Sequence, residues 1–297
     1  MDGILNIDKP AGITSYGVVA RVKRLTGERR VGHAGTLDPD ATGVLPVCLG
    51  KGTRITEYLS ETSKTYKAAI ELGISTDTYD TGGKIIQRGD ASGVDRTKLE
   101  SALNLFRGTI HQTPPMYSAI KHQGQPLYKL ARAGISVARK SRAVTVHRLA
   151  ITGWQPPLVT LEVECSKGTY IRSLAHDLGQ ALGCGAYLKS LVRTVYGPFN
   201  IKDAVSLPQL EGAFREGPWE RFLYPIDYVL QDYRAAVIGE AAEKAMRQGN
   251  ILTLETIDIL DASADTRCRA YASDGRFLGI LRYVSDKGAW QPEKVFF

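Results

Sequence analysis

Residues 32–54 read GHAGTLDPDATGVLPVCLGKGTR, and this stretch says most about the fold. Glycines at 32, 35 and 43 allow tight or positive-φ turns and a close approach of the backbone to a ligand. Pro39 fixes its own φ and moves Asp38 toward an extended conformation. An apolar strand is expected directly afterwards, at 44–49. The stretch therefore predicts a stiff loop that presents Asp38, with His33 nearby, although an Asp-Pro pair alone is most often a turn.

Further strands are expected on both sides of this loop, where apolar residues alternate or run continuously. They fall at 3–8, 66–72, 143–151, 158–165 and 188–196. Apolar faces at helical spacing predict helices after Thr14 or Ser15 and at 53–59, 98–106, 126–133 and 170–182. Residues 27–40 are expected to be loop throughout. Because the elements show no regular βαβ alternation, they predict an α+β fold with a mixed, largely antiparallel central sheet flanked by helices.

The pattern changes near residues 230–233. One helix is expected at 240–247, followed by short strand-like runs around Gly275, Gly279 and Gly288. This predicts a first domain of residues 1–231 and a small β-rich domain of residues 232–297.

Charge is unevenly distributed along the chain. The 297 residues carry 38 Lys and Arg against 31 Asp and Glu, whereas residues 232–297 carry 9 basic and 10 acidic residues. Residues 101–161 contain no Asp or Glu and eight basic side chains. A long basic surface suits a phosphate backbone, because each neutralised phosphate releases counterions. Simple solubility is the ordinary alternative.

Several classes of protein are disfavoured by missing motifs. The five histidines lack metal-ligand spacing, and neither GxxxxGK[ST] nor GxGxxG occurs. We therefore expect no metal and no cofactor. The four cysteines form no CxxC pair and are expected to be reduced, mostly buried thiols. With no secretory signal and no apolar run of about 20 residues, a cytoplasmic location is expected.

Two charged or aromatic positions stand out beyond the loop. Arg172 falls in the first turn of an expected helix, where the helix dipole disfavours a cation. A partner carboxylate would resolve this, with Asp38 as a candidate, and a surface salt bridge is the alternative. Tyr66 begins a strand and offers a ring for stacking on a base, whereas a core tyrosine is the more common reading.

The segment QTPPMYSAIKHQGQPLYKLARAG, residues 112–134, interleaves tyrosines with cations. Aromatic faces beside positive charge are what an RNA loop with exposed bases requires. Its basic residues Lys121, Lys129 and Arg132 are therefore candidate RNA contacts.

Four blocks in this order resemble the bacterial tRNA pseudouridine-55 synthases, the TruB family. They are NIDKPAGITS at 6–15, the stretch at 32–54, the segment at 112–134, and CSKGTYIRSLAHDLGQALGCGAYLKSLVR at 165–193. The resemblance implies a pseudouridine synthase fold and no obligatory protein partner. The tail, 232–297, more loosely resembles the PUA domain, a small RNA-binding module, although its net charge is not basic.

The resemblance also implies roles for individual residues. Asp38 matches the catalytic aspartate, Arg172 its paired arginine, and Tyr66 the active-site tyrosine. His33 matches the histidine that fills the space left by the flipped uridine, Leu191 lines the base pocket, and Tyr170 is assigned to substrate binding. Lys9 and Pro10 match a motif that supports the pocket.

The implied reaction is isomerisation of the T-loop uridine at position 55 of tRNA, after the base has been flipped out. An ionised Asp38 attacks C6 of the base or C1′ of the ribose, or assists elimination through a glycal; the residues leave these routes open. Arg172 is expected to hold the pKa of Asp38 down. Two other functions stay open, an RNA-folding factor and a guide-RNA-directed synthase.

Overall fold

A computed structural model gives the fold of this chain and describes residues 1–253 and 265–297. The chain forms two compact units, which meet in sequence between Leu223 and Tyr224. Each unit is described by itself. The predicted domain boundary at 231/232 stays a prediction.

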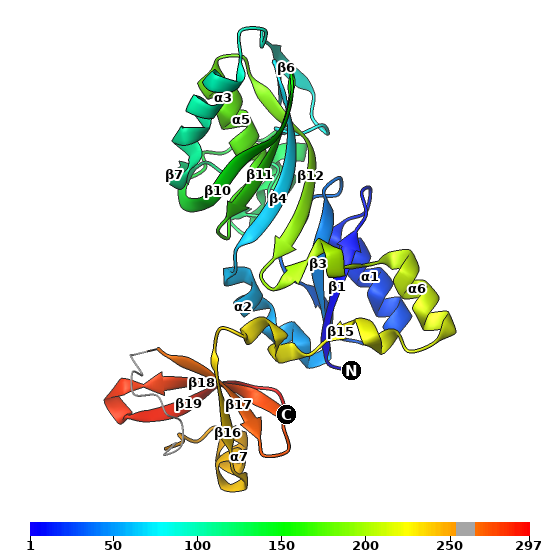
Figure 1. The fold of residues 1–297 in the computed structure, drawn as a ribbon, viewed down its shortest axis with the longest axis vertical. Coiled ribbons are helices and arrows are strands. Elements are labelled where there is room, and N and C mark those ends of the chain that lie inside the picture. Colours follow the sequence, from blue (N-terminus) through cyan, green and yellow to red (C-terminus); the bar gives the residue numbers. More distant parts are fainter. Residues whose placement is uncertain (254–264) are drawn as a thin grey trace. The chain divides into compact units, whose positions relative to one another are not determined.

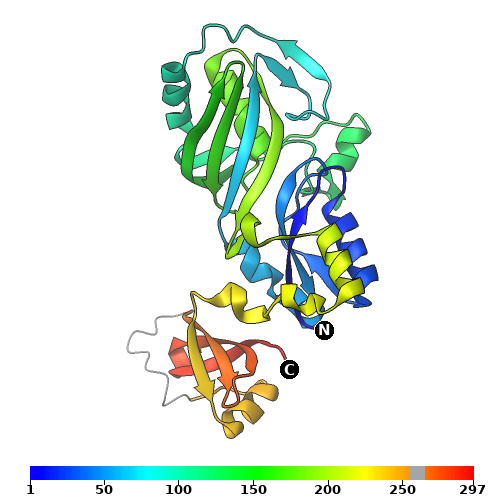
Figure 2. The ribbon, with the colours of Figure 1, turned by 45° about the vertical axis from the view of Figure 1, so that its right-hand side comes forward.

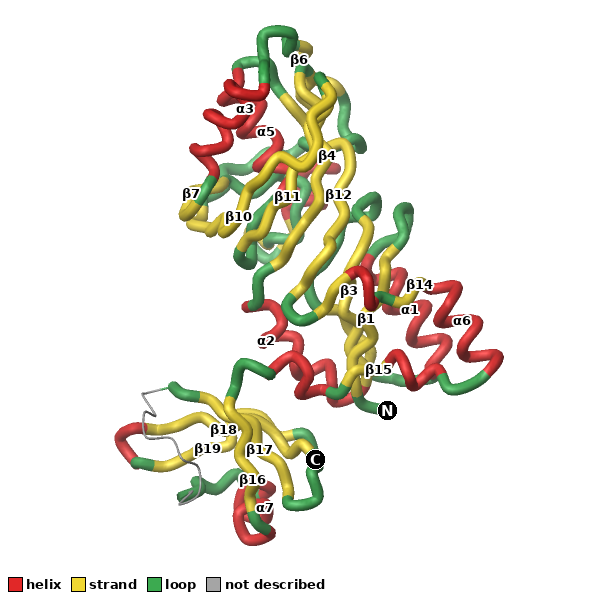
Figure 3. Tube along the Cα trace, in the orientation of Figure 1, coloured by secondary structure: helices red, strands yellow, loops and turns green. Residues whose placement is uncertain are grey.

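The first unit is built on one large sheet (Figure 3). Along the sheet the strand order is β14-β1-β3-β12-β4-β11-β10-β7. Neighbouring strands are antiparallel except for the pairs β1–β14 and β3–β12, which are parallel. The predicted mixed, largely antiparallel sheet is therefore confirmed. Ten of its eleven strands are β1 (Gly3–Lys9), β2 (Val31–His33), β3 (Thr42–Leu49), β4 (Lys64–Leu72), β7 (Gly108–Gln112), β10 (Arg142–Gln155), β11 (Leu158–Cys165), β12 (Ala186–Tyr196), β13 (Phe199–Asn200) and β14 (Val205–Ser206).

Two small hairpins and several helices complete this unit. The hairpins are β5 (Ile74–Thr76) with β6 (Ile85–Arg88) and β8 (Lys121–His122) with β9 (Gln125–Pro126). The α-helices are α1 (Ser15–Thr26), α2 (Thr56–Glu61), α3 (Arg96–Leu103), α4 (Leu127–Arg132), α5 (Ile171–Leu182) and α6 (Leu207–Glu216). Short 3-10 helices are η1 (Gly50–Ile55), η2 (Asn104–Phe106), η3 (Ile201–Asp203) and η4 (Trp219–Phe222), and the strand β15 (Leu223–Tyr224) follows.

The helices cover the sheet at two places and create two separate apolar cores. Helices α3 and α5 pack on strands β4, β10, β11 and β12, and Figures 1 and 2 show both helices beside these strands. Helices α1 and α6 lie side by side and pack on β1 and β3 (Figure 2). The sheet therefore carries one core at each of its two ends, and β12 lies between β3 and β4, where the two regions meet.

Local sequence explains most boundaries and three differences from expectation. Thr14 caps α1 by accepting a hydrogen bond from the amide of Gly17, and Gly27 ends that helix in the left-handed conformation. Residues 27–40 are not loop throughout, because β2 adds to the edge of β3 through backbone pairing that the side-chain pattern does not reveal. Helix α6 was not expected, although its capping box at Ser206 and Gln209 is a sequence signal. The helix expected at 53–59 is split between η1 and α2.

The second unit is a small sheet with one helix. Strands β16 (Arg234–Ile238), β17 (Arg267–Ala272), β18 (Phe277–Val284) and β19 (Ala289–Val295) lie in that order, with 3-10 helices η5 (Ile226–Leu230) and η6 (Ser285–Lys287) and helix α7 (Glu240–Arg247). An apolar core that includes Met246 and Trp290 holds it together. The predicted β-rich tail is confirmed within the described residues.

Candidate active site

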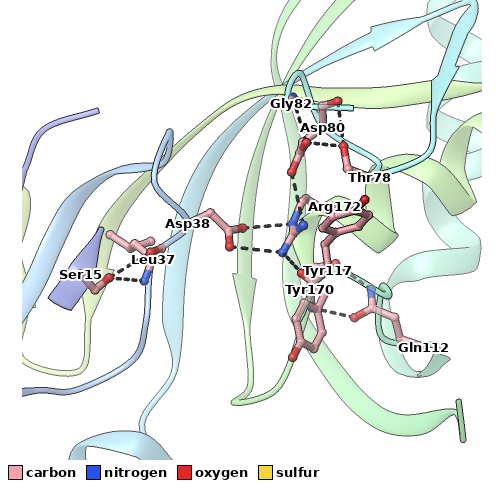
Figure 4. A network of polar contacts seen from close by, with 10 residues as sticks. All are labelled: Ser15, Leu37, Asp38, Thr78, Asp80, Gly82, Gln112, Tyr117, Tyr170 and Arg172. Atoms are coloured by element: carbon pink, nitrogen blue, oxygen red, sulfur yellow. Dashed lines mark hydrogen bonds and ion pairs between the residues drawn. The ribbon is translucent and has the colours of Figure 1, made fainter. Parts of the chain in front are cut away.

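Asp38 lies against the guanidinium of Arg172, 134 residues away in sequence (Figure 4). Nε of Arg172 is 3.0 Å from Oδ2 of Asp38, and Nη2 donates to Oδ1 at 3.2 Å. Nη1 lies 3.3 Å from Oδ2 of Asp80. The guanidinium therefore joins two carboxylates, and its two contacts with Asp38 fix the orientation of that side chain.

Arg172 is a buried residue rather than a member of a surface salt bridge, since its exposed fraction is 6%. It occupies the first turn of α5, which begins after Tyr170. Nη2 also donates to the carbonyl oxygen of Tyr117 at 2.8 Å. Two carboxylates, with a carbonyl oxygen as a further acceptor, thus offset the unfavourable interaction between the Arg172 cation and the positive end of the helix dipole.

The loop that carries Asp38 is held on both sides by buried polar groups. The hydroxyl of Ser15, at the start of α1, donates to the carbonyl of Leu37 and accepts from its amide, both at 2.9 Å. Lys9 is fully buried, and its ammonium donates to the carbonyls of Pro10, Pro39 and Ala41 at 2.9, 2.8 and 2.6 Å. These bonds fix the backbone immediately before and after Asp38.

The electrostatics of Asp38 differ from the expectation in one respect. Desolvation raises the pKa of Asp38 above its ordinary value of 3.8. Arg172 is the strongest influence that lowers the pKa of Asp38, as expected, but it does not outweigh burial, to which Asp80 adds a like charge. The side chain keeps 45% of its surface exposed, so a substrate has access to this carboxylate.

Tyr66 and Leu191 come to the same face of the sheet through the pairing of β4 with β12. Tyr66 lies opposite Arg193, and Leu191 lies opposite Ala68. Tyr66 and Leu191 are both partly buried and pack on the larger apolar core. Tyr66 is close enough to Asp38 for the carboxylate to affect the pKa of its phenol, which burial raises. The geometry therefore brings an aromatic ring and an apolar side chain to the edge of the carboxylate site.

His33 ends β2, opposite Val47. Its Nδ1 is buried without a hydrogen-bond partner among the described residues, and burial lowers the pKa of its imidazole. Tyr170 caps α5, and burial raises the pKa of its phenol, with smaller influences from Arg172 and Asp38. Tyr170 thus lies at the carboxylate site, whereas His33 makes no hydrogen bond to Asp38 or Arg172 in the part of the chain that the structure describes.

The segment 112–134 is anchored at the start of α5. The side chain of Gln112 donates to the carbonyl of Tyr170 at 2.9 Å and accepts from its amide at 2.7 Å. Figure 4 shows this pair beside the carboxylates. The three cationic candidates are exposed and lie outside the polar network; they are Lys121, Lys129 and Arg132. The guanidinium of Arg132 lies 5.8 Å from the centre of the Tyr128 ring.

Two residues of the site were missed from the sequence. Asp80 sits in the polar run STDTYDTGG, and its Oδ1 accepts from the hydroxyl of Thr78 at 2.6 Å and the amide of Gly82 at 3.0 Å. The sequence signal for Asp80 is an acidic residue within a run of turn-forming residues. Arg193 follows Leu191 by two residues on the same strand face, which is a signal only once the strand is known to line the site.

Other sequence expectations concern the wider chain. All four cysteines are buried and free, as expected. In residues 1–253 and 265–297, no cluster of His, Cys, Asp or Glu is arranged to hold a metal ion. The helices of those residues include none that is long and apolar enough to cross a membrane.

Comparison with known proteins gives consistent matches over the whole chain. The profile for the TruB family pseudouridylate synthase N-terminal domain matches residues 23–171, and that for the tRNA pseudouridylate synthase B C-terminal domain matches residues 172–231. A protein of Dehalococcoides mccartyi (strain ATCC BAA-2100 / JCM 16839 / KCTC 5957 / BAV1) named tRNA pseudouridine synthase B is 47% identical over 296 residues, which cover 100% of this chain and 97% of that protein. A protein of the same name from Ectopseudomonas mendocina (strain ymp) is 42% identical over 300 residues, covering 100% and 96%.

Solved structures agree with these relatives. A chain in the crystal structure of a Cbf5-Nop10-Gar1 complex is 27% identical and superposes with a TM-score of 0.75, covering 99% of this chain and 85% of that one. The fold predicted from the resemblance is therefore confirmed. With two family profiles over most of the first unit and relatives of 42–47% identity over the full length, the chain belongs to the TruB family of pseudouridylate synthases and is an isomerase.

Proposed function

We propose that this enzyme converts the T-loop uridine at position 55 of tRNA to pseudouridine, with Asp38 as the reacting carboxylate. The observation that carries the proposal is the carboxylate itself, which is reachable by a substrate yet held by two contacts to Arg172 on a braced loop. The relatives' names supply the substrate class, because they are called tRNA pseudouridine synthases.

The chemistry requires the uridine to leave its stack, at a cost of a few kcal/mol. His33 fills the space that the base leaves, and the ring of Tyr66 stacks on the flipped uracil beside Leu191. Asp38 then attacks C6 or C1′, or assists elimination through a glycal. The C–N bond breaks, the uracil turns while bound, and a C–C bond forms at its C5. Tyr66 takes part in removing the C5 proton.

Contacts with the tRNA come from the cations of the 112–134 segment. Gln112 bonds this segment to Tyr170, directly before α5, and the carbonyl of Tyr117 accepts from Arg172. A nucleic acid bound to the segment therefore lies next to the carboxylate. The second unit acts as a PUA-like module and binds the acceptor stem. The enzyme works in the cytoplasm without an obligatory protein partner and needs no metal or cofactor.

The test of the reaction uses tRNA transcript labelled with tritium at uridine C5. The purified chain is expected to release tritium from one T-loop uridine, and Asp38→Asn is expected to abolish release while tRNA binding persists. Asp40→Asn is the matched control in the same loop, since its side chain is exposed, and it should keep turnover. A chain that binds the transcript but releases nothing is instead an RNA-folding factor or depends on a guide RNA.

The test of the binding surface removes three charges together. Removing a single phosphate interaction should lower the slope of log K against log salt by about one, so the triple alanine variant should weaken binding and lower the slope by up to ~3. Equal slopes for the variant and the unchanged chain would contradict the assignment. The variant replaces Lys121, Lys129 and Arg132, and the control variant replaces the exposed Arg88, Arg96 and Lys98.

A further inference from the structure

Arg193 is a buried cation whose partners within residues 1–253 and 265–297 are all neutral. Its exposed fraction is 1%. Nε donates to the carbonyl of Val44 at 2.7 Å, and Nη2 donates to the carbonyl of Gly35 at 2.8 Å. The guanidinium also lies 4.7 Å from the centre of the Tyr196 ring. A charge taken out of water costs several kcal/mol even after relaxation, so a neutral environment for a cation is expensive.

The position of Arg193 in the sheet relates it to Tyr66. In the pairing of β12 with β4, Arg193 lies directly opposite Tyr66, so the two side chains leave the same face of the sheet. The charge of the guanidinium is close enough to Tyr66 to lower the pKa of its phenol. The bonds to the carbonyls of Gly35 and Val44 hold the guanidinium, and with it the charge, in one place.

We propose that Arg193 is a positioning residue that acts through Tyr66: it is a fixed, buried cation opposite Tyr66 on the same face of the sheet, and its charge favours the phenolate that accepts the C5 proton. This rests on the proposed function. Burial raises the pKa of Tyr66, and the charge of Arg193 is the largest influence in the opposite direction. A guanidinium is suited to this because it stays protonated at every pH of interest.

Atoms and electrons balance in the step that Arg193 supports. Once C5 has bonded to C1′, it still carries its hydrogen. The phenol of Tyr66 has already given its own proton to water, with the guanidinium stabilising the phenolate. The phenolate oxygen then takes the proton from C5, and the electron pair of the C5–H bond forms the C5–C6 double bond of the product. C6 gives up a bond at the same moment: the π pair of the N1–C6 double bond moves to N1, which takes a proton from water. On the route where Asp38 had attacked C6, the C6–O bond breaks instead, and its electron pair returns to the carboxylate. The proton later exchanges with solvent, as tritium release requires.

A purely structural role for Arg193 makes a different prediction. Through the carbonyl of Gly35 it braces the loop that carries Asp38, so its loss would slow cleavage of the C–N bond. If it acts through Tyr66, its loss slows only the proton transfer that follows. The two roles are separated by substrates that report each step by itself.

The experiment compares Arg193→Gln with the unchanged chain on three tRNA transcripts, carrying uridine, 5-deuterio-uridine or 5-fluorouridine. Fluorine cannot leave as a proton, so the fluorinated transcript reports bond cleavage and C–C bond formation only. General-base assistance is worth ~10²–10⁴-fold, and we expect kcat on uridine to fall ~10–100-fold because Tyr66 itself remains. The deuterium isotope effect on kcat should rise above its value in the unchanged chain, while conversion of 5-fluorouridine keeps its rate.

Lys64→Met is the matched control. Lys64 is a buried cation on the same strand as Tyr66, but it donates to the carbonyls of Ser60 and Thr62. Its loss should lower thermal stability without changing the isotope effect. Should Arg193→Gln not fold, as judged by melting and tRNA binding, Arg193→Lys is the second variant. It keeps the charge but loses the guanidinium that bonds the carbonyls of Val44 and Gly35, so a smaller rise in the isotope effect is expected.

Two results would overturn the proposal. One is an equal slowing on uridine and 5-fluorouridine with no change in isotope effect, which assigns Arg193 to the Asp38 loop. The other is a variant with unchanged kcat and isotope effect. Failure of the unchanged chain to convert uridine at all would instead refute the proposed function, so the two failures are distinguishable.

Discussion

Replacing Arg172 by methionine removes the counter-charge that Asp38 and Asp80 share. At an effective dielectric constant of 20, two unit charges 4 Å apart interact by about 4 kcal/mol. Because 45% of the Asp38 side chain is exposed, water screens this attraction, and we discount it to roughly 1–2 kcal/mol. That free energy corresponds to a factor of ~5–30 in the ionisation equilibrium of Asp38.

The direction of the pH effect follows from the state that reacts. Asp38 must be ionised, so kcat/KM rises with pH as its carboxyl loses a proton. Desolvation already places this rise above the ordinary pKa of 3.8, and loss of Arg172 moves it to higher pH. Loss of the two oriented contacts adds a pH-independent decrease of about 10²-fold.

The assay is tritium release under single turnover, measured from acid to neutral pH. Arg172→Met should lose ~5–30-fold more activity on the acid side than at neutral pH. Arg267→Met is the matched control, since Arg267 pairs with Glu293 in the second unit at 2.9 Å, and its pH profile should match that of the unchanged chain. The same decrease in activity at every pH, with the rise of kcat/KM at an unchanged pH, would refute the reasoning, because Arg172 would then orient Asp38 without stabilising its charge.

Three more predictions concern the groups around the loop. Asp80→Asn should leave Arg172 bound to Asp38 and shift the acid limb of kcat/KM to lower pH, because Asp80 raises the pKa of Asp38; a shift to higher pH would contradict this. Lys9→Met should lower the free energy of unfolding measured in urea. Burial lowers the pKa of Lys9 in the folded chain to about 8 from 10.5, so the unchanged chain gains stability as pH rises through 8–10.5 and the methionine variant does not. The difference in unfolding free energy between the two should therefore grow by about 3 kcal/mol over that range. Gly43→Ala should lower the free energy of unfolding by about 3 kcal/mol or more, because the φ of Gly43 is +98° and a Cβ would lie 2.2 Å from the carbonyl oxygen of Arg193. Gly212→Ala is the control, because open space surrounds Gly212 and the free energy of unfolding should not fall.

Much of this protein follows from local patterns in its sequence. Helix α1 and strands β1 and β3 could be placed because capping and apolar periodicity act over a few residues. The stretch at 32–54 could be read as the carrier of Asp38 because glycine permits tight turns and proline restricts the backbone wherever they stand. The family likewise followed from blocks of sequence, and the comparisons confirmed it.

The arrangement of charges around Asp38 was decided by the tertiary structure alone. Arg172 meets Asp38 across 134 residues of chain and Asp80 across 92. Arg193 becomes a buried cation facing Tyr66 only because β12 pairs with β4 in one register. The net direction of the Asp38 pKa shift depends on how much water the folded loop excludes. Local rules specify elements, whereas burial and charge–charge distances depend on how those elements pack, and no short window of sequence contains that information.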